Sequence, residues 1–286
     1  MKLSPKTVSW LQAAPLGLTI LVFFGMPMLL VLVVSFFDYG RTQMIPAFIL
    51  DNYAELFQSN LTLRLYLTAF RYAAIVWAIT LVIGFTVAYF LVFHVRSLVW
   101  QIGLFLLCTV PFWTSNIIRM ISWIPFLGLH GVFNQGLIGL GLVHQPLSFL
   151  LFSDFAVIVA YVHLNTLFMI VPIFNSMARI DRSVVEAAYD AGAGRWRVVQ
   201  EIVLPLSKTG IALGSIFVIT LVMGDFFVVK VMSGGQSATV VSALSTEIAS
   251  LQYPPAAASS VVLVIIVALI VSAILRLVDV RKELTG

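Results

Sequence analysis

The sequence predicts an all-α polytopic membrane protein with six transmembrane helices and both termini in the cytoplasm. Apolar residues make up 61% of the 286-residue chain and charged residues only 10%, too few charges to cover the surface of a soluble protein. Six apolar runs are each long enough to cross a hydrocarbon core of about 30 Å as a helix. Lysine and arginine gather in alternate connecting segments, as in cytoplasmic loops. These observations indicate a single transmembrane domain over residues 1–286.

The expected spans follow one another along the chain, joined by loops on alternate sides of the membrane. Their approximate ranges are 11–37, 66–93, 98–118, 152–177, 209–229 and 258–278. The first run superficially resembles a secretory signal. It is longer than the roughly 7–15 apolar residues of a signal peptide, and no clear small-residue cleavage site follows it. We therefore expect an uncleaved first span.

Basic residues set the orientation of the spans. With the N-terminus inside, the larger basic set faces the cytoplasm: Lys2, Lys6, Arg96, Arg179, Arg182, Arg195, Arg197, Lys208, Arg276, Arg281 and Lys282. The smaller set lies outside or at span edges: Arg41, Arg64, Arg71, Arg119 and Lys230. The positive-inside rule therefore places both termini and the loop 176–208 in the cytoplasm. The net charge of +4 has the same explanation and does not indicate a nucleic-acid partner.

The two long outer loops differ in character. Residues 38–64 are polar and contain the segment 51–57, which we expect to form a short amphipathic element at the membrane surface. Residues 122–148 lack lysine, arginine, aspartate and glutamate but are rich in glycine. Two interpretations of this Gly-rich outer loop stay open: re-entrant or interfacial turns that line a vestibule, or a loop packed on the other helices.

The cytoplasmic loop 176–208 contains the signals of an ordered helix. Ser183 and Glu186 fit an S-x-x-E capping box, in which the serine caps the helix and the glutamate reaches back to the serine amide. Glu186 is then expected in the first turn, where the helix dipole favours a negative charge. Ala187 and Ala188 follow as small, strong helix formers that another chain could approach closely.

A second short helix is expected after this one. Gly192 and Gly194 interrupt the first helix and let the chain turn. Residues 195–202 carry an apolar side, and Leu204 and Pro205 are expected to end the helix and lead into the fifth span. Taken alone, this pattern also fits a helix-turn-helix loop that lies on the membrane without a partner.

The complete spacing of the loop is more specific than its parts. It reads E-A-A, three residues, glycine, nine residues and I-x-L-P, over the residues Glu186, Ala187, Ala188, Gly192, Ile202, Leu204 and Pro205. This pattern resembles the cytoplasmic coupling loop of permease subunits of binding-protein-dependent ABC importers. Ala191 stands where the family usually has a larger apolar residue. The resemblance implies a type I ABC-importer permease fold and makes these seven residues the ATPase-coupling positions.

Two further stretches support the resemblance. The segment 51–57 is similar to the N-Y-x-x-L-F element of the family, and residues 111–115 followed by Arg119 are similar to the third span of spermidine/putrescine-type permeases. The resemblance therefore implies a bacterial inner-membrane protein that forms half of the path for a polyamine or related small organic solute.

The family also implies the partners. These are two ATPase subunits, a second, similar permease subunit and an extracytoplasmic solute-binding protein. No cofactor is expected in this chain, since ATP and magnesium would be bound by the ATPase.

Enzymatic activity is not expected in this chain. The stretch 233–236 reads S-G-G-Q, like the signature of ABC ATPases, but no G-x-x-x-x-G-K-[ST] phosphate loop occurs, and the stretch falls on the outer side. His94, His130, His144 and His163 have no metal-ligand spacing to one another or to Cys108. The sequence thus predicts neither a metal site nor a catalytic site.

Ionisable residues at membrane depth are candidates for the solute pathway, because they are costly to place there. Asp225, with Phe226, Phe227 and Arg119, forms the candidate set. The alternative is that Asp225 pairs with Lys230 or Arg119 and only holds the helices together. Two other functions stay open: a stand-alone secondary transporter or channel driven by an ion gradient, and a membrane scaffold without transport.

Overall fold

The computed structural model describes residues 5–40 and 43–278, with side chains from residue 10 onward. Of the basic residues named above, Lys2, Arg41, Arg281 and Lys282 therefore lie outside the described residues, and the side chain of Lys6 does too. The chain divides into two units. Of the described residues, 5–40, 43–64 and 243–266 form unit 1, and 65–242 and 267–278 form unit 2.

Unit 1 begins with an apolar helical segment, α1 (Pro5–Ile20), a π turn η1 (Leu21–Gly25) and α2 (Met26–Val34). A short antiparallel hairpin follows, with β1 (Asp38–Tyr39) paired to β2 (Met44–Ile45). The next helix is α3 (Asp51–Gln58), at the place of the expected amphipathic element. The unit also contains most of α15 (Val240–Ala249) and the first part of α16 (Tyr253–Leu277).

Polar bonds tie α3 to the end of α2. The Asn52 side chain is buried, and its amide donates to the carbonyl oxygens of Ser35 at 3.1 Å and Phe37 at 2.8 Å. The hydroxyls of Ser35 and Tyr53 lie 2.7 Å apart. These bonds satisfy backbone carbonyls that the end of α2 leaves unpaired.

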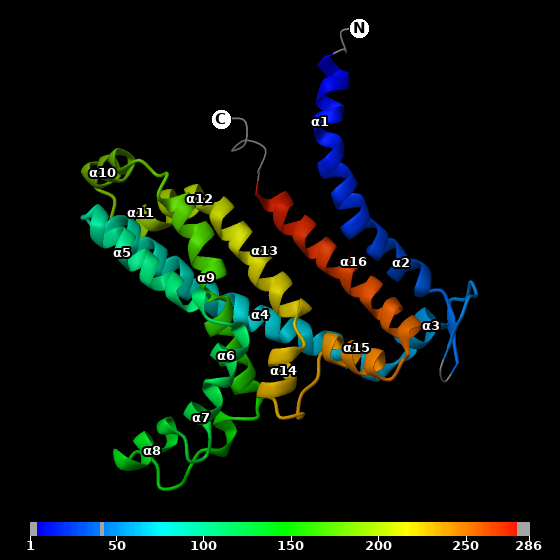
Figure 1. Ribbon diagram of the computed structural model, residues 1–286. Coiled ribbons are helices and arrows are strands. Elements are labelled where there is room, and N and C mark those ends of the chain that lie inside the picture. Colours follow the sequence, from blue (N-terminus) through cyan, green and yellow to red (C-terminus); the bar gives the residue numbers. More distant parts are fainter. Residues whose placement is uncertain (1–4, 41–42, 279–286) are drawn as a thin grey trace. The chain divides into compact units, whose positions relative to one another are not determined.

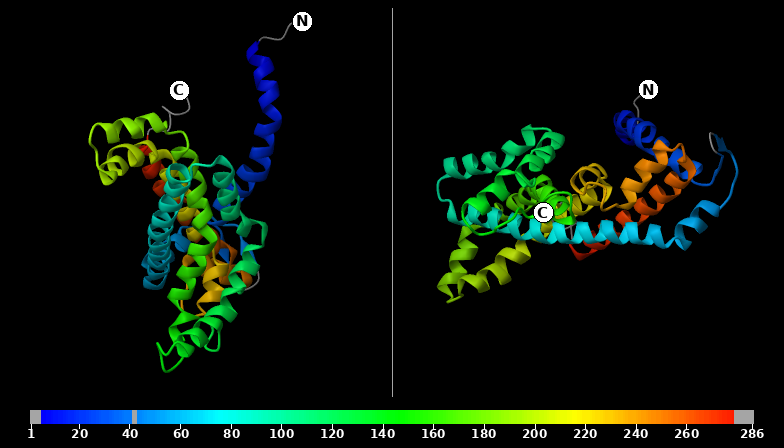
Figure 2. Two further views of the ribbon diagram at one scale, coloured as in Figure 1. Left: turned by 90° about the vertical axis from the view of Figure 1, so that its left-hand side faces the viewer. Right: turned by 90° about the horizontal axis from the view of Figure 1, so that it is seen from below.

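Unit 2 holds the remaining elements. Its first half contains α4 (Asn60–Tyr89), which begins in unit 1, η2 (Phe90–His94), α5 (Leu98–Thr109), η3 (Val110–Trp113), α6 (Asn116–Ile121), α7 (Trp123–Leu127), α8 (Val132–Gly139) and η4 (Ser148–Leu150). Its second half contains α9 (Asp154–Met177), α10 (Arg182–Asp190), α11 (Arg195–Val198), η5 (Val199–Val203), α12 (Leu204–Leu206), α13 (Lys208–Gly224) and α14 (Phe227–Met232). Within this unit, α10 lies at one end of α9, and α7 and α8 lie at the other (Figure 1). Figure 2 shows the same separation along α9 from the side.

Close helix packing forms the core of unit 2. A Cβ atom added to Gly210 of α13 would lie 2.4 Å from the carbonyl oxygen of Pro172, and one added to Gly214 would lie 2.7 Å from the sulfur of Met169. A Cβ on Gly84 of α4 would lie 2.7 Å from the Met169 side chain. Glycine at these positions lets the helix backbones approach closely, as small residues do in membrane proteins. The helices α4, α9 and α13 therefore pack without space for a larger residue.

Five described helices are long and apolar enough to span a membrane, or six if one bent pair counts as a single span. The expected first, second, fourth and sixth spans coincide with long helical segments. The expected third span is not one helix, because the backbone is extended at Thr114 and α6 starts anew behind the cap of Ser115. The long apolar segment here is Asn116–Gly139, so helices occupy part of the Gly-rich loop.

Candidate functional site

The helix predicted from the E-A-A spacing exists, but its start differs from the expectation. Asp181, not Ser183, is the N-cap of α10, and its carboxylate accepts a hydrogen bond from the Ser183 backbone N–H at 2.9 Å. Glu186 is consequently beyond the first turn, and the predicted capping box is wrong. The same Ser183 N–H lowers the pKa of Asp181, since the bond favours the ionised carboxylate.

The end of α10 is fixed by backbone geometry at Gly192. This residue has a φ of +84°, a conformation that glycine adopts without strain. Its N–H donates to the carbonyl of Tyr189 at 2.9 Å, and the N–H of Ala193 donates to the carbonyl of Ala188 at 2.9 Å. These two bonds form a Schellman motif, so the predicted interruption at Gly192 has a clear structural cause.

The surface of α10 is open along its length. None of its residues is buried: Glu186 and Ala187 are exposed, Ala188 is half-buried, and the apolar Val184 is 44% exposed. Only Val185 and Ala188 are partly covered, and an amphipathic helix with so little of its apolar side buried is unusual in a folded chain. The expected coupling positions on α10 are therefore accessible to another protein.

The segment after α10 joins it to α13 through a bend. α11, the π turn η5 and α12 form one continuous helical piece, which makes an angle of 68° with α13. The expected helix end at Pro205 is wrong: the helix runs to Leu206 and the bend falls at Ser207, whose hydroxyl donates to the carbonyl of Val203 at 2.6 Å. Ile202 is half-buried, while Leu204 and Pro205 are exposed.

A cavity of about 550 Å³ lies behind α10, between it and the end of α4. Its walls include aromatic residues of α4 and η2, together with Glu186 and the three arginines Arg96, Arg182 and Arg195. Arg182 also donates to the carbonyl oxygen of Val92 at 3.2 Å. This bond is a direct polar link between α10 and the helix that precedes α5.

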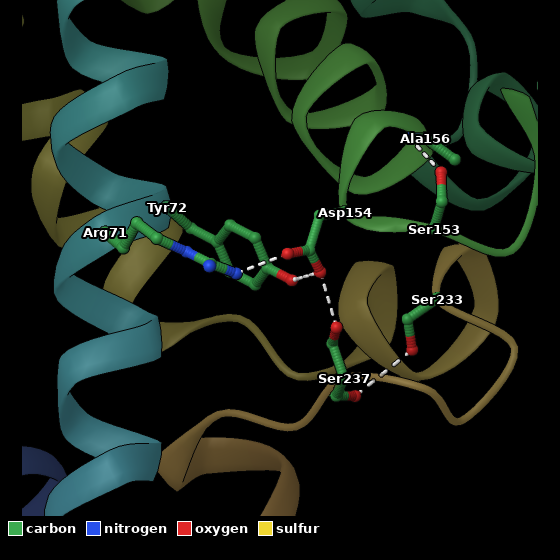
Figure 3. Close-up of polar contacts among 7 residues, drawn as sticks. All are labelled: Arg71, Tyr72, Ser153, Asp154, Ala156, Ser233 and Ser237. Atoms are coloured by element: carbon green, nitrogen blue, oxygen red, sulfur yellow. Dashed lines mark hydrogen bonds and ion pairs between the residues drawn. The ribbon is translucent and has the colours of Figure 1, made fainter. Parts of the chain in front are cut away.

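The opposite end of α9 carries a different arrangement, which we call the Asp154 network. The carboxylate of Asp154 forms an ion pair with Arg71 and accepts hydrogen bonds from the hydroxyls of Tyr72, at 2.5 Å, and Ser237 (Figure 3). Ser153 caps the helix here, and its hydroxyl accepts from the Ala156 N–H at 3.2 Å. The network thus joins α4, the start of α9 and the loop before α15.

The S-G-G-Q stretch forms an ordered turn beside this network. Gly234 and Gly235 have φ values of +59° and +82°, and the hydroxyl of Ser233 donates to the carbonyl oxygen of Ser237 at 3.1 Å. A Cβ on Gly234 would lie 2.8 Å from the side chain of Phe152, so only glycine fits against that ring. The turn therefore holds Ser237 in place for its bond to Asp154.

Asp225 lies where the expected fifth span is interrupted, between α13 and α14. Its carboxylate accepts from the backbone N–H of Val228 at 2.8 Å and from the hydroxyl of Tyr161 at 3.3 Å. Within the described part of the chain, no hydrogen bond or ion pair joins it to Lys230 or Arg119, the partners considered in the alternative interpretation. Phe226 and Phe227 adjoin it, with ring centroids 6.3 Å apart.

Arg119 lies elsewhere in unit 2, on α6. It is only 7% exposed, donates to the side-chain oxygen of Asn116 and lies 5.5 Å from the ring centroid of Phe112. The structure therefore does not link Arg119 directly to Asp225. Next to α6, the indole N–H of Trp123 donates to Nδ1 of His163 at 3.0 Å.

The comparisons with known proteins agree with this geometry. The family model described as "Binding-protein-dependent transport system inner membrane component" matches residues 101–283. The chain belongs to this family. The matched range of this inner-membrane component includes the segment with α10, as well as Arg119 and Asp154, whereas Arg71 and Tyr72 precede it.

Curated relatives are similar over most of their length. The spermidine/putrescine transport system permease protein PotB of Escherichia coli is 31% identical over 234 residues, covering 82% of this chain and 84% of PotB. The protein of the same name from Haemophilus influenzae is 32% identical over 230 residues, covering 79% of each chain.

Solved structures show that the fold is that of an ABC-importer chain. A chain of a bacterial ABC transporter that imports the acidic polysaccharide alginate superposes with a TM-score of 0.77, at 18% identity, covering 95% of this chain and 96% of that one. A second structure, of the alginate transporter in complex with an alginate pentasaccharide-bound periplasmic protein, gives a TM-score of 0.76 at 17% identity.

Proposed function

We propose that this inner-membrane component forms half of the translocation pathway of an ABC importer and couples transport to ATP hydrolysis in a separate subunit. Its partners would be two ATPase subunits, a second, similar permease subunit and an extracytoplasmic solute-binding protein. ATP and magnesium would be bound by the ATPase. Both termini and α10 would face the cytoplasm, in line with the distribution of basic residues.

The observation that carries this proposal is α10 itself. It is a helix fixed at its start by Asp181 and at its end by Gly192, and it carries Glu186 and Ala187 exposed and Ala188 half-buried. A secondary transporter or channel has no need of such a helix. An ATPase that changes shape on binding nucleotide needs a rigid surface of this kind to contact.

The packing around α10 suggests how a movement would pass into the membrane. Residues 178–181 join the start of α10 to α9. The helical piece that follows α10, α11 to α12, joins α13 through the 68° bend. Because α9 and α13 pack at glycine positions with no spare space, displacement of α10 would move the two helices together. Such rigid-body movement would open the pathway to each side in turn.

The proposed solute is a polyamine or a related small organic compound. This rests on the names of the curated relatives, which are spermidine/putrescine permeases. An external binding protein would make the first selection of solute, and the permease would then have to accept what that protein delivers.

Reconstitution with the candidate ATPase tests the coupling role. We expect Glu186→Ala to lower ATP-dependent uptake at least about tenfold and to weaken association with the ATPase, because a charged contact at an interface is lost. The matched control is Glu201→Ala, which removes an exposed glutamate whose ion pair among the described residues is with Arg197. If Glu186→Ala leaves both association and uptake intact, α10 is not the coupling surface.

A further inference from the structure

Three arginines from different segments line the cavity behind α10. Arg96 lies in the turn between η2 and α5, Arg182 begins α10, and Arg195 begins α11. Neither ion pair found among the described residues involves any of them. Like charges that face one cavity repel one another, and an anion placed between them removes that repulsion. The cavity therefore has the charge arrangement of an anion site.

The charged groups of this cavity do not balance. Its lining contains one acidic residue, Glu186, against the three arginines, which leaves two positive charges in excess even when His94 is neutral. All three arginines are exposed, so a ligand can reach them from solvent. An anion with up to two negative charges would neutralise this excess without any rearrangement of the chain.

The arginines favour a phosphate over a carboxylate. Arg182 is held at the cavity wall by its bond to the carbonyl oxygen of Val92 at 3.2 Å, and its guanidinium has further N–H donors for a ligand. Each guanidinium can contact two oxygens of one anion. Three such groups on different segments approach from different directions, which suits a tetrahedral phosphate better than the two coplanar oxygens of a carboxylate.

The rest of the cavity has room for the organic part of a phosphate compound. Its volume of about 550 Å³ is much larger than a phosphate ion, and its walls include Tyr89, Phe93 and Tyr189. The ring centroids of Tyr89 and Phe93 lie 5.1 Å apart. Tyrosine offers both an apolar ring and a hydroxyl group, so these walls can cover carbon atoms and also bond to hydroxyl groups.

The position of the cavity admits phosphate from two sources. Arg96 lies between the segments expected to form the second and third spans, so the cavity is at the end of membrane-spanning helices. Headgroup phosphates lie at this level of a bilayer, and basic pockets between spans on the cytoplasmic side bind anionic headgroups. Soluble phosphate esters reach the same place from the cytoplasm.

We propose that the cavity behind α10 binds a phosphate group, carried by a membrane-lipid headgroup or by a soluble phosphate ester. The phosphate oxygens accept from Arg96, Arg182 and Arg195, and the remainder of the ligand lies against the aromatic walls. Because these arginines belong to different segments, the bound phosphate joins the end of α4 to α10 and α11 and restricts the movement of α10. Binding at this site does not require α10 to contact an ATPase.

Titration calorimetry of the full chain in a maltoside detergent, which carries no phosphate, tests the inference. Ribose 5-phosphate and ribose differ by one phosphate group, and we expect saturable binding of the first and none of the second at the same concentrations. Dihexanoyl phosphatidylglycerol, titrated in the same way, represents the lipid source. Whichever phosphate probe binds at least about tenfold more tightly identifies the source, and each should displace the other.

Substitutions of the arginines assign the binding to this cavity. Arg96→Gln and Arg195→Gln should each weaken phosphate binding about tenfold, because a charge-assisted hydrogen bond is lost. Both residues are exposed and outside the ion pairs of the described residues, so the unfolding temperature should not change. The matched control is Arg179→Gln, which removes an exposed arginine before α10 that does not line the cavity. Saturating ligand should also slow amide exchange in α10.

Four results would overturn the inference. The first is that neither phosphate probe binds; if Arg96→Gln then loses the ATPase, the arginines contact acidic groups of that subunit instead. The second is that ribose binds as tightly as ribose 5-phosphate. The third is that Arg96→Gln and Arg195→Gln bind as well as Arg179→Gln, and the fourth is that amide exchange of α10 is unchanged at saturation. Since the titration contains neither ATP nor ATPase, full uptake by Glu186→Ala would refute the coupling role while leaving this inference standing.

Discussion

The two ends of α9 are built in opposite ways. At one end, α10 has no buried residue and touches the rest of unit 2 through few polar bonds, such as that of Arg182 to Val92. At the other end, Asp154 collects three partners from two other segments. A helix that another protein must bind has to keep its surface accessible. A helix end that must keep its position is bonded within its own chain.

The substitution with the largest expected effect lies in the helix core between these two ends. We expect Gly210→Ala to cost about 3 kcal/mol of stability, because its Cβ would meet the Pro172 carbonyl at 2.4 Å and force α9 and α13 apart. Loss of transport should accompany this cost, since both ends depend on the same helix pair. Thermal unfolding of the solubilised protein, with uptake, is the measurement.

The control for this prediction is Gly103→Ala in α5, where the added Cβ would meet no described atom within 4 Å beyond its chain neighbours and the backbone of its own helix. Alanine there should be neutral or slightly stabilising, since glycine is a poor helix former. Equal behaviour of the two variants would show that α9 and α13 are not closely packed.

The α10 end is tested by Gly192→Val. A β-branched residue at φ +84° should cost about 1–2 kcal/mol locally, and uptake should fall because the exposed helix loses its fixed end. Gly194→Ala is the matched control, since Gly194 has a φ of −69° that any residue adopts. The contrast is measured as ATP-dependent uptake at equal amounts of folded protein. Full uptake by Gly192→Val would mean that the end of α10 needs no fixed geometry.

The Asp154 end should respond more weakly to a single substitution. Asp154→Ala removes an ion pair whose side chains are 53% and 40% exposed, so solvent screening reduces its contribution. The lost bonds to Tyr72 and Ser237 should dominate, and we expect a cost of about 1–2 kcal/mol. Asp154→Asn should recover part of the lost stability, since its amide oxygen can still accept hydrogen bonds. If Asp154→Asn is no more stable than Asp154→Ala, only the charge contributes, and the hydrogen-bond network is contradicted.

The smallest expected effect is a pH dependence at the start of α10. The bond from Ser183 lowers the pKa of Asp181 in the folded state, so its contribution is present above the unfolded pKa of about 3.9 and is lost as pH falls through the folded value. Amide exchange of α10 should thus be constant, after correction for intrinsic rates, above about pH 5 and increase below about pH 4. Asp181→Asn should show no such change, because asparagine caps at every pH. A similar increase in that variant would assign the effect to another group.

The position and the end of α10 could be predicted from the sequence, but its start could not. The E-A-A spacing and Gly192 are local signals, and local signals were sufficient for the helix and its end. The start was misassigned because Asp181 and Ser183 are both good caps and lie two residues apart. The interruption at Thr114 was missed because the apolar composition continues across it.

The Asp154 network could not be assembled from the sequence. Asp154 is visible as a carboxylate at a span edge, but Arg71 and Ser237 each lie 83 residues away along the chain. Asp225 shows the same difficulty: its nearby candidate was Lys230, whereas the structure gives it Tyr161, 64 residues away. Partners across the helix bundle depend on packing, which a single sequence does not encode locally.

The π turn η5 has a consequence for the register of the segment between α10 and α13. Val198 and Val203 are both buried, although five positions of a regular α-helix place two side chains about 140° apart. The wider turn contains one more residue than an α-helical turn and so brings both valines to the same side. Deleting a single residue from Val199–Val203 should convert the π turn into an α-helical turn, in which the two buried valines are four positions and about 40° apart. The π turn therefore holds one additional residue while the buried side of the helical segment stays the same before and after it.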